Sequence, residues 1–88
     1  MARLKHELWR EPEEEETFCL AGPDGDAARA RMSPGAVLVW TVWATSHFEA
    51  MTRYYVHRGW GRYTTSHEWD LQPYPEEWLQ RQREAGVV

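Results

Sequence analysis

SHFEAMTRYYVHRGWG, residues 46–61, is the stretch that decides the fold, because its start signal, its periodicity and its stop signal agree. Ser46 and Glu49 have the spacing of a capping box, in which the serine hydroxyl accepts from the Glu49 amide and the Glu49 carboxylate reaches back to the Ser46 amide. Gly59 stands where a left-handed residue commonly ends a helix. The stretch therefore predicts a helix over residues 46–58.

The helical period sorts the side chains of this helix into two faces. At about 100° per residue, Phe48, Met51 and Tyr55 fall on one apolar stripe. Glu49 and Arg53 fall on the opposite side, with the order and spacing of a stabilising acid–base pair. We therefore expect the helix to pack its apolar stripe on a sheet and to turn its charged side to water.

The apolar segment before this helix, AVLVWTVWA at residues 36–44, is the strongest strand signal in the chain. It is rich in β-branched and aromatic residues and contains no charge and no proline. Both alternating sets of side chains are apolar, and a strand of this kind is normally buried on both faces. The following helix can cover only one face, so the other is expected to need the C-terminal helix, a second subunit or a ligand.

Weaker signals place the other elements. Residues 4–10 alternate as a strand does, and residues 17–21 form a short apolar run that pairs with them as a hairpin. An acidic loop at 11–16 joins the two. Turn residues precede a short helix at about 25–32, and a proline followed by acidic residues opens a helix at about 75–84.

Together these elements predict a single small α+β domain. The expected fold is a three-stranded, mostly antiparallel sheet (about 4–10, 17–21 and 36–44) with the main helix 46–58 on one face, a short helix about 25–32 and a C-terminal helix about 75–84. No linker divides the 88 residues into two domains, and the tail 85–88 is expected to be mobile.

Composition restricts the classes of function. The net charge is −4, with fourteen acidic residues against ten basic ones, which disfavours nucleic acid as a partner because nucleic-acid binders normally carry a basic face. The one cysteine, Cys19, excludes an internal disulfide. No apolar leader stands at the N-terminus and no apolar run is long enough for a bilayer. We therefore expect a cytoplasmic protein with no membrane partner.

The sequence offers no recognisable catalytic or metal-binding motif. A zinc site needs about four converging ligands, and the candidates, which lack any paired short spacing, are His6, Cys19, His47, His57 and His67. There is no HExxH motif, phosphate loop, dinucleotide fingerprint or serine elbow. The sequence therefore predicts no catalytic residue, no metal and no cofactor.

The apolar strand favours a non-enzymatic binding module whose partner is itself, as a homodimer, or another protein. Residues 36–44 would form the interface. Trp40 or Trp43 would anchor it, depending on which face of the strand stays open, because buried aromatic residues are the usual hot spots of interfaces.

Two alternatives remain open. One is a small-ligand-binding protein or enzyme with a pocket between the start of the main helix and the 59–63 loop, in which His47 is the acid/base or hydrogen-bonding group. The residues expected to line that pocket are His47, Tyr54, Arg58, Trp60 and Arg62. The other is weak binding of single-stranded nucleic acid by the arginine and aromatic residues of 53–63, which the overall acidity opposes.

Overall fold

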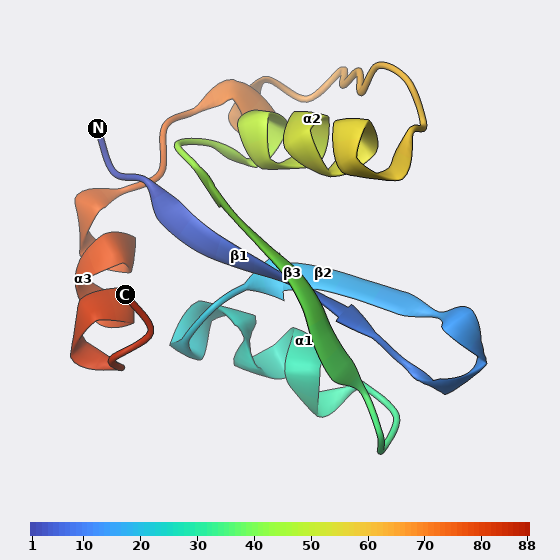
Figure 1. Cartoon of the computed structure of the whole chain (residues 1–88). Coiled ribbons are helices and arrows are strands. Elements are labelled where there is room, and N and C mark those ends of the chain that lie inside the picture. Colours follow the sequence, from blue (N-terminus) through green and yellow to red (C-terminus); the bar gives the residue numbers. More distant parts are fainter.

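The computed structural model describes all 88 residues and shows a small α+β fold (Figure 1). Its three strands form one antiparallel sheet in the order β2–β1–β3. The strands are β1 (Leu4–Arg10), β2 (Glu16–Leu20) and β3 (Val37–Ala44), and the helices are α1 (Asp26–Ala30), α2 (His47–Arg58) and α3 (Glu76–Glu84). The predicted fold class is therefore confirmed, and α1 is clearly shorter than expected.

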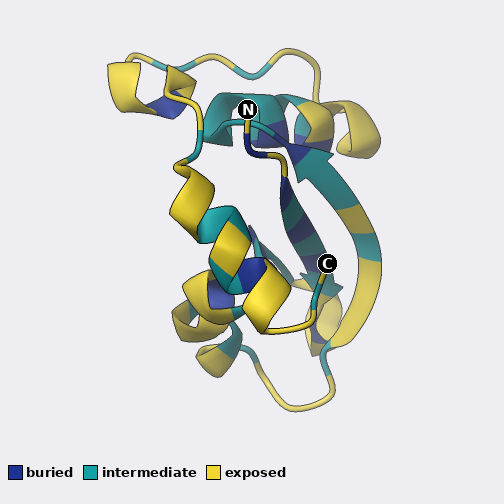
Figure 2. Ribbon diagram, turned by 90° about the vertical axis from the view of Figure 1, so that its left-hand side faces the viewer, coloured by how far each residue is buried: buried dark blue, intermediate teal, exposed yellow.

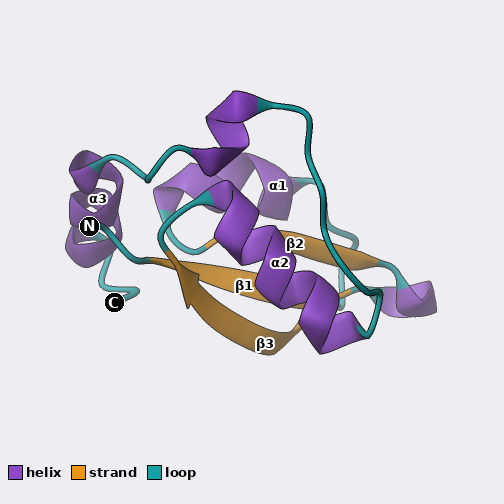
Figure 3. Cartoon of the chain, turned by 90° about the horizontal axis from the view of Figure 1, so that it is seen from above, coloured by secondary structure: helices purple, strands orange, loops and turns teal.

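The helices cover the sheet unevenly (Figure 1 and Figure 3). α2 crosses one face, α1 lies on the opposite side, and α3 stands at the end of the sheet beside the first residues of β1. Three short 3-10 turns, at Pro12–Glu14, Pro23–Gly25 and Glu68–Leu71, interrupt the connections. No helix combines the length and the apolar character that a membrane crossing requires.

α2 begins and ends close to the predicted positions. The amide of Glu49 donates to Ser46 Oγ at 3.0 Å, and Gly59 has a φ of 72°, the left-handed conformation that ends a helix. The second half of the predicted capping box is different, because the Glu49 carboxylate accepts from the amide of Thr45 at 2.7 Å instead of from Ser46. The carboxylate therefore fixes the chain one residue earlier, where β3 turns into the helix.

The core lies between β1 and α2. Leu4, His6 and Leu8 project from one face of β1 and are at most 3% exposed. The buried residues of α2, Ala50 and Tyr54, lie over the same face of the sheet, where the ring of Tyr54 stacks on Phe18 of β2. The alternation predicted for β1 is thus confirmed, since the side chains of its other face are only partly buried.

α2 is rotated relative to the stripe that the sequence suggested. Phe48 and Tyr55, expected to face the sheet, pack their rings against Tyr63, with ring centroids 5.7 and 5.2 Å apart. The reason is that the chain after α2 folds back along the outer side of the helix and provides a second apolar surface. Phe48 and Tyr55 are covered by this segment, while the smaller Ala50 allows close approach to the strands.

The expectation that residues 36–44 are buried on both faces is wrong. β3 pairs only with β1 and is an outer strand of the sheet. Val37, Leu38 and Val39 are 54%, 45% and 38% exposed, and Figure 2 shows β3 as mostly exposed or intermediate along its length. The central position belongs to β1, which bonds with both neighbours.

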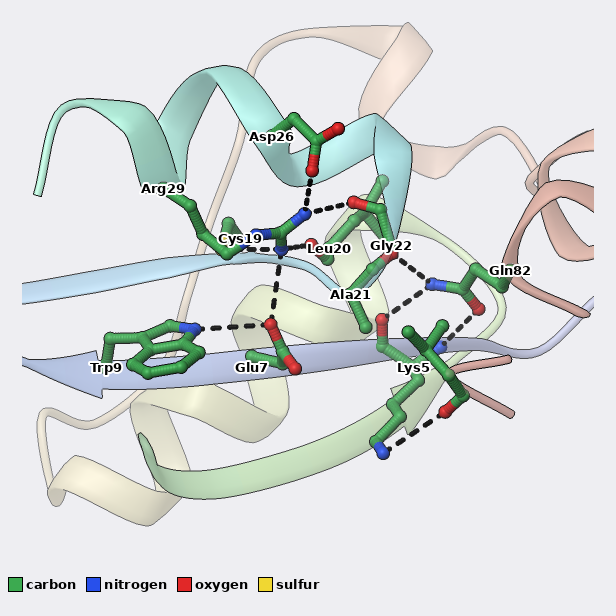
Figure 4. Close-up of polar contacts among 11 residues, drawn as sticks. Lys5, Glu7, Trp9, Cys19, Leu20, Ala21, Gly22, Asp26, Arg29 and Gln82 are labelled. Atoms are coloured by element: carbon green, nitrogen blue, oxygen red, sulfur yellow. Dashed lines mark hydrogen bonds and ion pairs between the residues drawn. The ribbon is translucent and has the colours of Figure 1, made fainter. Parts of the chain in front are cut away.

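α3 is joined to the sheet by a buried glutamine (Figure 4). Gln82 is 1% exposed; its Oε1 accepts from the amide of Lys5 at 3.0 Å, and its Nε2 donates to the carbonyls of Lys5 and Ala21 at 2.9 and 3.0 Å. The side-chain amide occupies the place of a peptide group just beyond the end of β2. It thereby extends the hydrogen bonding of β1 on that side.

Arg29 joins the connection between β2 and α1 to the sheet through hydrogen bonds (Figure 4). Its guanidinium bonds the carboxylate of Glu7 at 3.2 Å and the carbonyl of Leu20 at 2.8 Å, and it also contacts the carbonyl of Gly22. Gly25 is required in this turn, because a Cβ there would lie 1.8 Å from the carbonyl oxygen of Leu20. The far end of β2 is therefore tied to the rest of the fold by several polar contacts.

Candidate functional site

The five residues predicted to line one pocket lie at the two ends of α2. His47 is in the first turn and Arg58 in the last, which separates them by roughly 16 Å along the helix axis. Tyr54 and Trp60 lie near Arg58, and Arg62 is exposed in the loop beyond. The structure does not bring His47 together with the other four.

The C-terminal end of α2 forms a cluster around Glu16. The hydroxyl of Tyr54 donates to Glu16 Oε2 at 2.8 Å, and Arg58 Nη2 lies 2.9 Å from Glu16 Oε1. The Arg58 guanidinium lies over the ring of Trp60 at 5.6 Å. Burial, together with the Glu16 carboxylate, raises the pKa of Tyr54 to about 12. These polar groups are paired with one another and connect α2 to β2.

The N-terminal end of α2 borders a pocket of about 550 Å³, a size typical of small-molecule sites. β1, β2, α2 and the segment from Trp69 to Trp78 contribute to its walls. Most of its lining is aromatic or apolar, including Phe18, Met51 and Tyr74. His47 is among the few polar residues that line it.

His47 is held by a buried carboxylate. Asp70 is 1% exposed; its Oδ1 lies 2.8 Å from His47 Nδ1, and its Oδ2 accepts from the hydroxyl of Tyr63 at 2.7 Å. Burial raises the pKa of Asp70, but hydrogen bonds from Tyr63, Thr65 and His47 outweigh it, so the pKa lies below its usual value. Because an ionised carboxylate only accepts, Nδ1 of His47 carries a proton. Nε2 has no hydrogen-bond partner in the protein.

His6, on the opposite wall of the pocket, has a hydrogen-bond partner for each of its two ring nitrogens. Its Nδ1 lies 3.1 Å from the carbonyl of Leu4, so Nδ1 is the donor. Burial lowers the pKa of His6 to about 4, which leaves the ring neutral at pH 7. Nε2 must then accept, and the hydroxyl of Tyr74 donates to it at 2.9 Å. Burial raises the pKa of Tyr74, so this donor keeps its proton.

Sequence reasoning singled out His47 but missed the residues that position it. Asp70 and Tyr63 are 23 and 16 positions away in the chain, and no motif links those spacings. Asp70 lies in the short turn Glu68–Leu71, and the sequence of such a turn does not indicate which side chain it faces.

The outer strand β3 is the second candidate region. Trp40 lies under α2, where its ring stacks on His57 with centroids 4.0 Å apart. Trp43 is opposite Lys5 on β1 and projects from the other face of the sheet, which α2 does not cover. Of the two tryptophans predicted as anchors, the structure therefore places Trp43 on the face that α2 does not cover, together with Leu38 and the exposed Thr41. Trp43 also borders Leu79 and Arg83 of α3.

Other chemistry has little support from the geometry. No group of three or more His, Cys, Asp or Glu side chains converges as the ligands of a metal ion would. Cys19 is buried and forms no disulfide, and burial raises the pKa of its thiol.

No protein-family model, curated protein or solved structure matches this chain.

Proposed function

We propose that this protein is a non-enzymatic interaction module that self-associates through the outer edge of β3. The observation that carries this proposal is the character of that edge: eight residues without a charge or a proline, with Val37, Leu38 and Val39 substantially exposed. A long, apolar edge strand without charge or proline is a template for pairing with another strand, and monomeric proteins usually block such edges.

A second copy of the chain is the partner that fits this edge. Two β3 strands related by a two-fold axis run antiparallel, so the sheet would continue from one protomer into the other with the same surface on both sides. No charge in β3 opposes this approach. Backbone hydrogen bonds would supply affinity, and the apolar side chains would remove their exposed area from water.

Trp43 is the anchor in this arrangement. It lies on the face of β3 that α2 leaves open and is only partly buried. Leu38 and Thr41 flank it on the same face. A two-fold pairing would bring these side chains of the two protomers close together, which is how central aromatic residues usually contribute to interfaces.

The arginine and aromatic cluster gives less support to nucleic-acid binding. Arg58 is paired with Glu16 at 2.9 Å, and Arg53 lies 3.8 Å from Glu49. Their charges are therefore largely compensated within the fold.

A cytoplasmic location stays part of the proposal, since the one cysteine, Cys19, is buried and unpaired.

Sedimentation velocity over a wide range of protein concentration tests the proposal. The wild type should shift from monomer to dimer as concentration rises. Leu38→Lys should weaken the dimer at least tenfold, because two like charges would approach across the axis, at a cost of more than about 1.4 kcal/mol. Leu38 is 45% exposed, so the monomer should tolerate the change.

Leu71→Lys is the matched control. It adds the same charge at an apolar residue that is 57% exposed and lies outside β3, and dimerisation should be unchanged. A wild type that remains monomeric at all concentrations, or two variants that behave alike, would contradict the proposal.

A further inference from the structure

We infer that the pocket beside the first turn of α2 binds a small aromatic weak acid of the phenol class, with the ligand hydroxyl donating to Nε2 of His47. This site is separate from the outer edge of β3 and does not depend on self-association.

The walls of the pocket suit a flat aromatic ring. Trp69 and His47 lie with ring centroids 5.8 Å apart, Tyr74 and Trp78 at 5.7 Å, and Phe18 packs nearby on the β2 side. Rings at such separations form offset or tilted pairs, and a further ring inserted among them would make the same favourable contacts. The volume of about 550 Å³ accommodates a single- or fused-ring molecule.

The pocket presents one free polar atom of an imidazole ring. Both nitrogens of His6 are occupied, by Leu4 and Tyr74, and the hydroxyl proton of Tyr74 is used in that bond. Nδ1 of His47 is bonded to Asp70, whereas Nε2 has no partner. Of the two histidines in the pocket, only His47 therefore offers a ligand a free acceptor, and this acceptor would fix its orientation.

The chemistry at Nε2 selects the ligand group. With a single proton on the ring, which Asp70 holds at Nδ1, His47 presents a lone pair at Nε2. The ionised carboxylate behind the ring strengthens that acceptor, since hydrogen bonds in a chain polarise one another. A hydroxyl with an acidic proton is the matching donor. An ether or an unsubstituted ring would leave Nε2 without a partner.

Calorimetric titration of the full chain with 2-naphthol tests this inference, with 2-methoxynaphthalene as the matched probe because it keeps the rings and the oxygen but has no proton to donate. We expect one 2-naphthol per chain and an affinity about tenfold higher than that of the ether. His47→Leu should remove this preference and leave binding of the ether nearly unchanged. Equal affinities for the two probes in the wild type, or no binding of either, would overturn the inference.

Two further variants separate the pocket from other surfaces. Met51→Trp places a larger ring into the cavity that Met51 lines and should abolish binding of both probes, with circular dichroism confirming the fold. His57→Leu changes a histidine of the same helix that stacks on Trp40 outside the pocket, and should leave both affinities unchanged. Binding that survives Met51→Trp in a folded protein, or that depends on His57, would contradict the site.

Leu38→Lys distinguishes this inference from the proposed self-association. Leu38 lies on β3, away from the pocket, so a variant that no longer dimerises should still bind 2-naphthol with unchanged affinity. A parallel loss of both properties would show that the two regions are not independent and would count against the pocket as described.

Discussion

The two outer strands of the sheet, β2 and β3, differ in length, in charge and in their polar contacts with the rest of the fold. β2 has five residues and begins at Glu16, whose carboxylate bonds Tyr54 and Arg58. At its other end Arg29 donates to the carbonyl of Leu20, and Gln82 bonds Lys5 and Ala21 where the pairing with β1 ends. β3 has eight residues and no charged or proline residue. The difference teaches that this small fold ties one outer strand to its helices with polar side chains and leaves the other without charged contacts.

The contrast has a physical basis in how edges are protected. Short length and charged side chains are common means of preventing an edge strand from pairing with another chain. β2 has both, since it is short and follows the acidic residues Glu13, Glu14 and Glu15. β3 has neither. The asymmetry is therefore what a protein that associates through one specific edge would need.

The largest expected effect concerns the end of β2. Gln82→Leu removes three hydrogen bonds and leaves the amide of Lys5 and the carbonyl of Ala21 unpaired, whereas the carbonyl of Lys5 still accepts from the amide of Ala21 at 3.0 Å. Each buried group left unpaired costs about 1–3 kcal/mol, so we expect the free energy of unfolding to fall by about 3 kcal/mol or more. Urea denaturation followed by circular dichroism measures this change.

Gln80→Leu is the control for that experiment. Gln80 lies on the same helix, is exposed, and makes one surface hydrogen bond to Glu84 at 3.3 Å. The same substitution there should change stability by less than about 0.5 kcal/mol. If both variants lose similar stability, the role assigned to Gln82 in continuing the hydrogen bonding of β1 is wrong.

A somewhat smaller effect on the free energy of unfolding is expected from pH, through His6 on the central strand β1. His6 has its pKa lowered from 6.5 to about 4 by burial. Between these values the unfolded chain binds a proton that the folded chain does not. The contribution of neutral His6 to the free energy of unfolding is therefore complete above about pH 6.5 and is lost as the pH falls toward 4. The loss is on the order of 3 kcal/mol.

Urea denaturation at a series of pH values measures this dependence. His6→Leu should flatten the curve between pH 6.5 and 4, although its stability at pH 7 will be reduced because Tyr74 loses its acceptor. His57→Leu, at an exposed histidine of α2, should retain the slope. A His6→Leu variant with the wild-type pH dependence would show that another group carries it.

The sequence was sufficient for the elements but not for their order in the sheet. β1 and α2 were predicted closely because alternation and capping are local properties of the chain. The apolar character of β3 suggested a strand covered on both faces, yet a central position requires bonding on both edges, and that depends on long-range pairing. β1, which buries only the face of Leu4 and Leu8, took that place.

The candidate site shows the same limit. His47 was identified because it lies at the start of the main helix, but it was grouped with Tyr54 and Arg58, which share that helix and lie toward its other end. Its true neighbour, Asp70, reaches it from a turn 23 residues later in the chain. Proximity in sequence is a good guide within one helix turn and a poor one across a whole helix.

Hydrogen exchange of the backbone amides, measured by NMR at several protein concentrations, tests the central claim most directly. Amides in Val37–Ala44 that point away from β1 should exchange more slowly as concentration rises, because they become paired with a second copy. The outward amides of Glu16–Leu20 should show no such dependence. Exchange in β3 that is fast and independent of concentration, while the rest of the sheet is protected, would contradict the account.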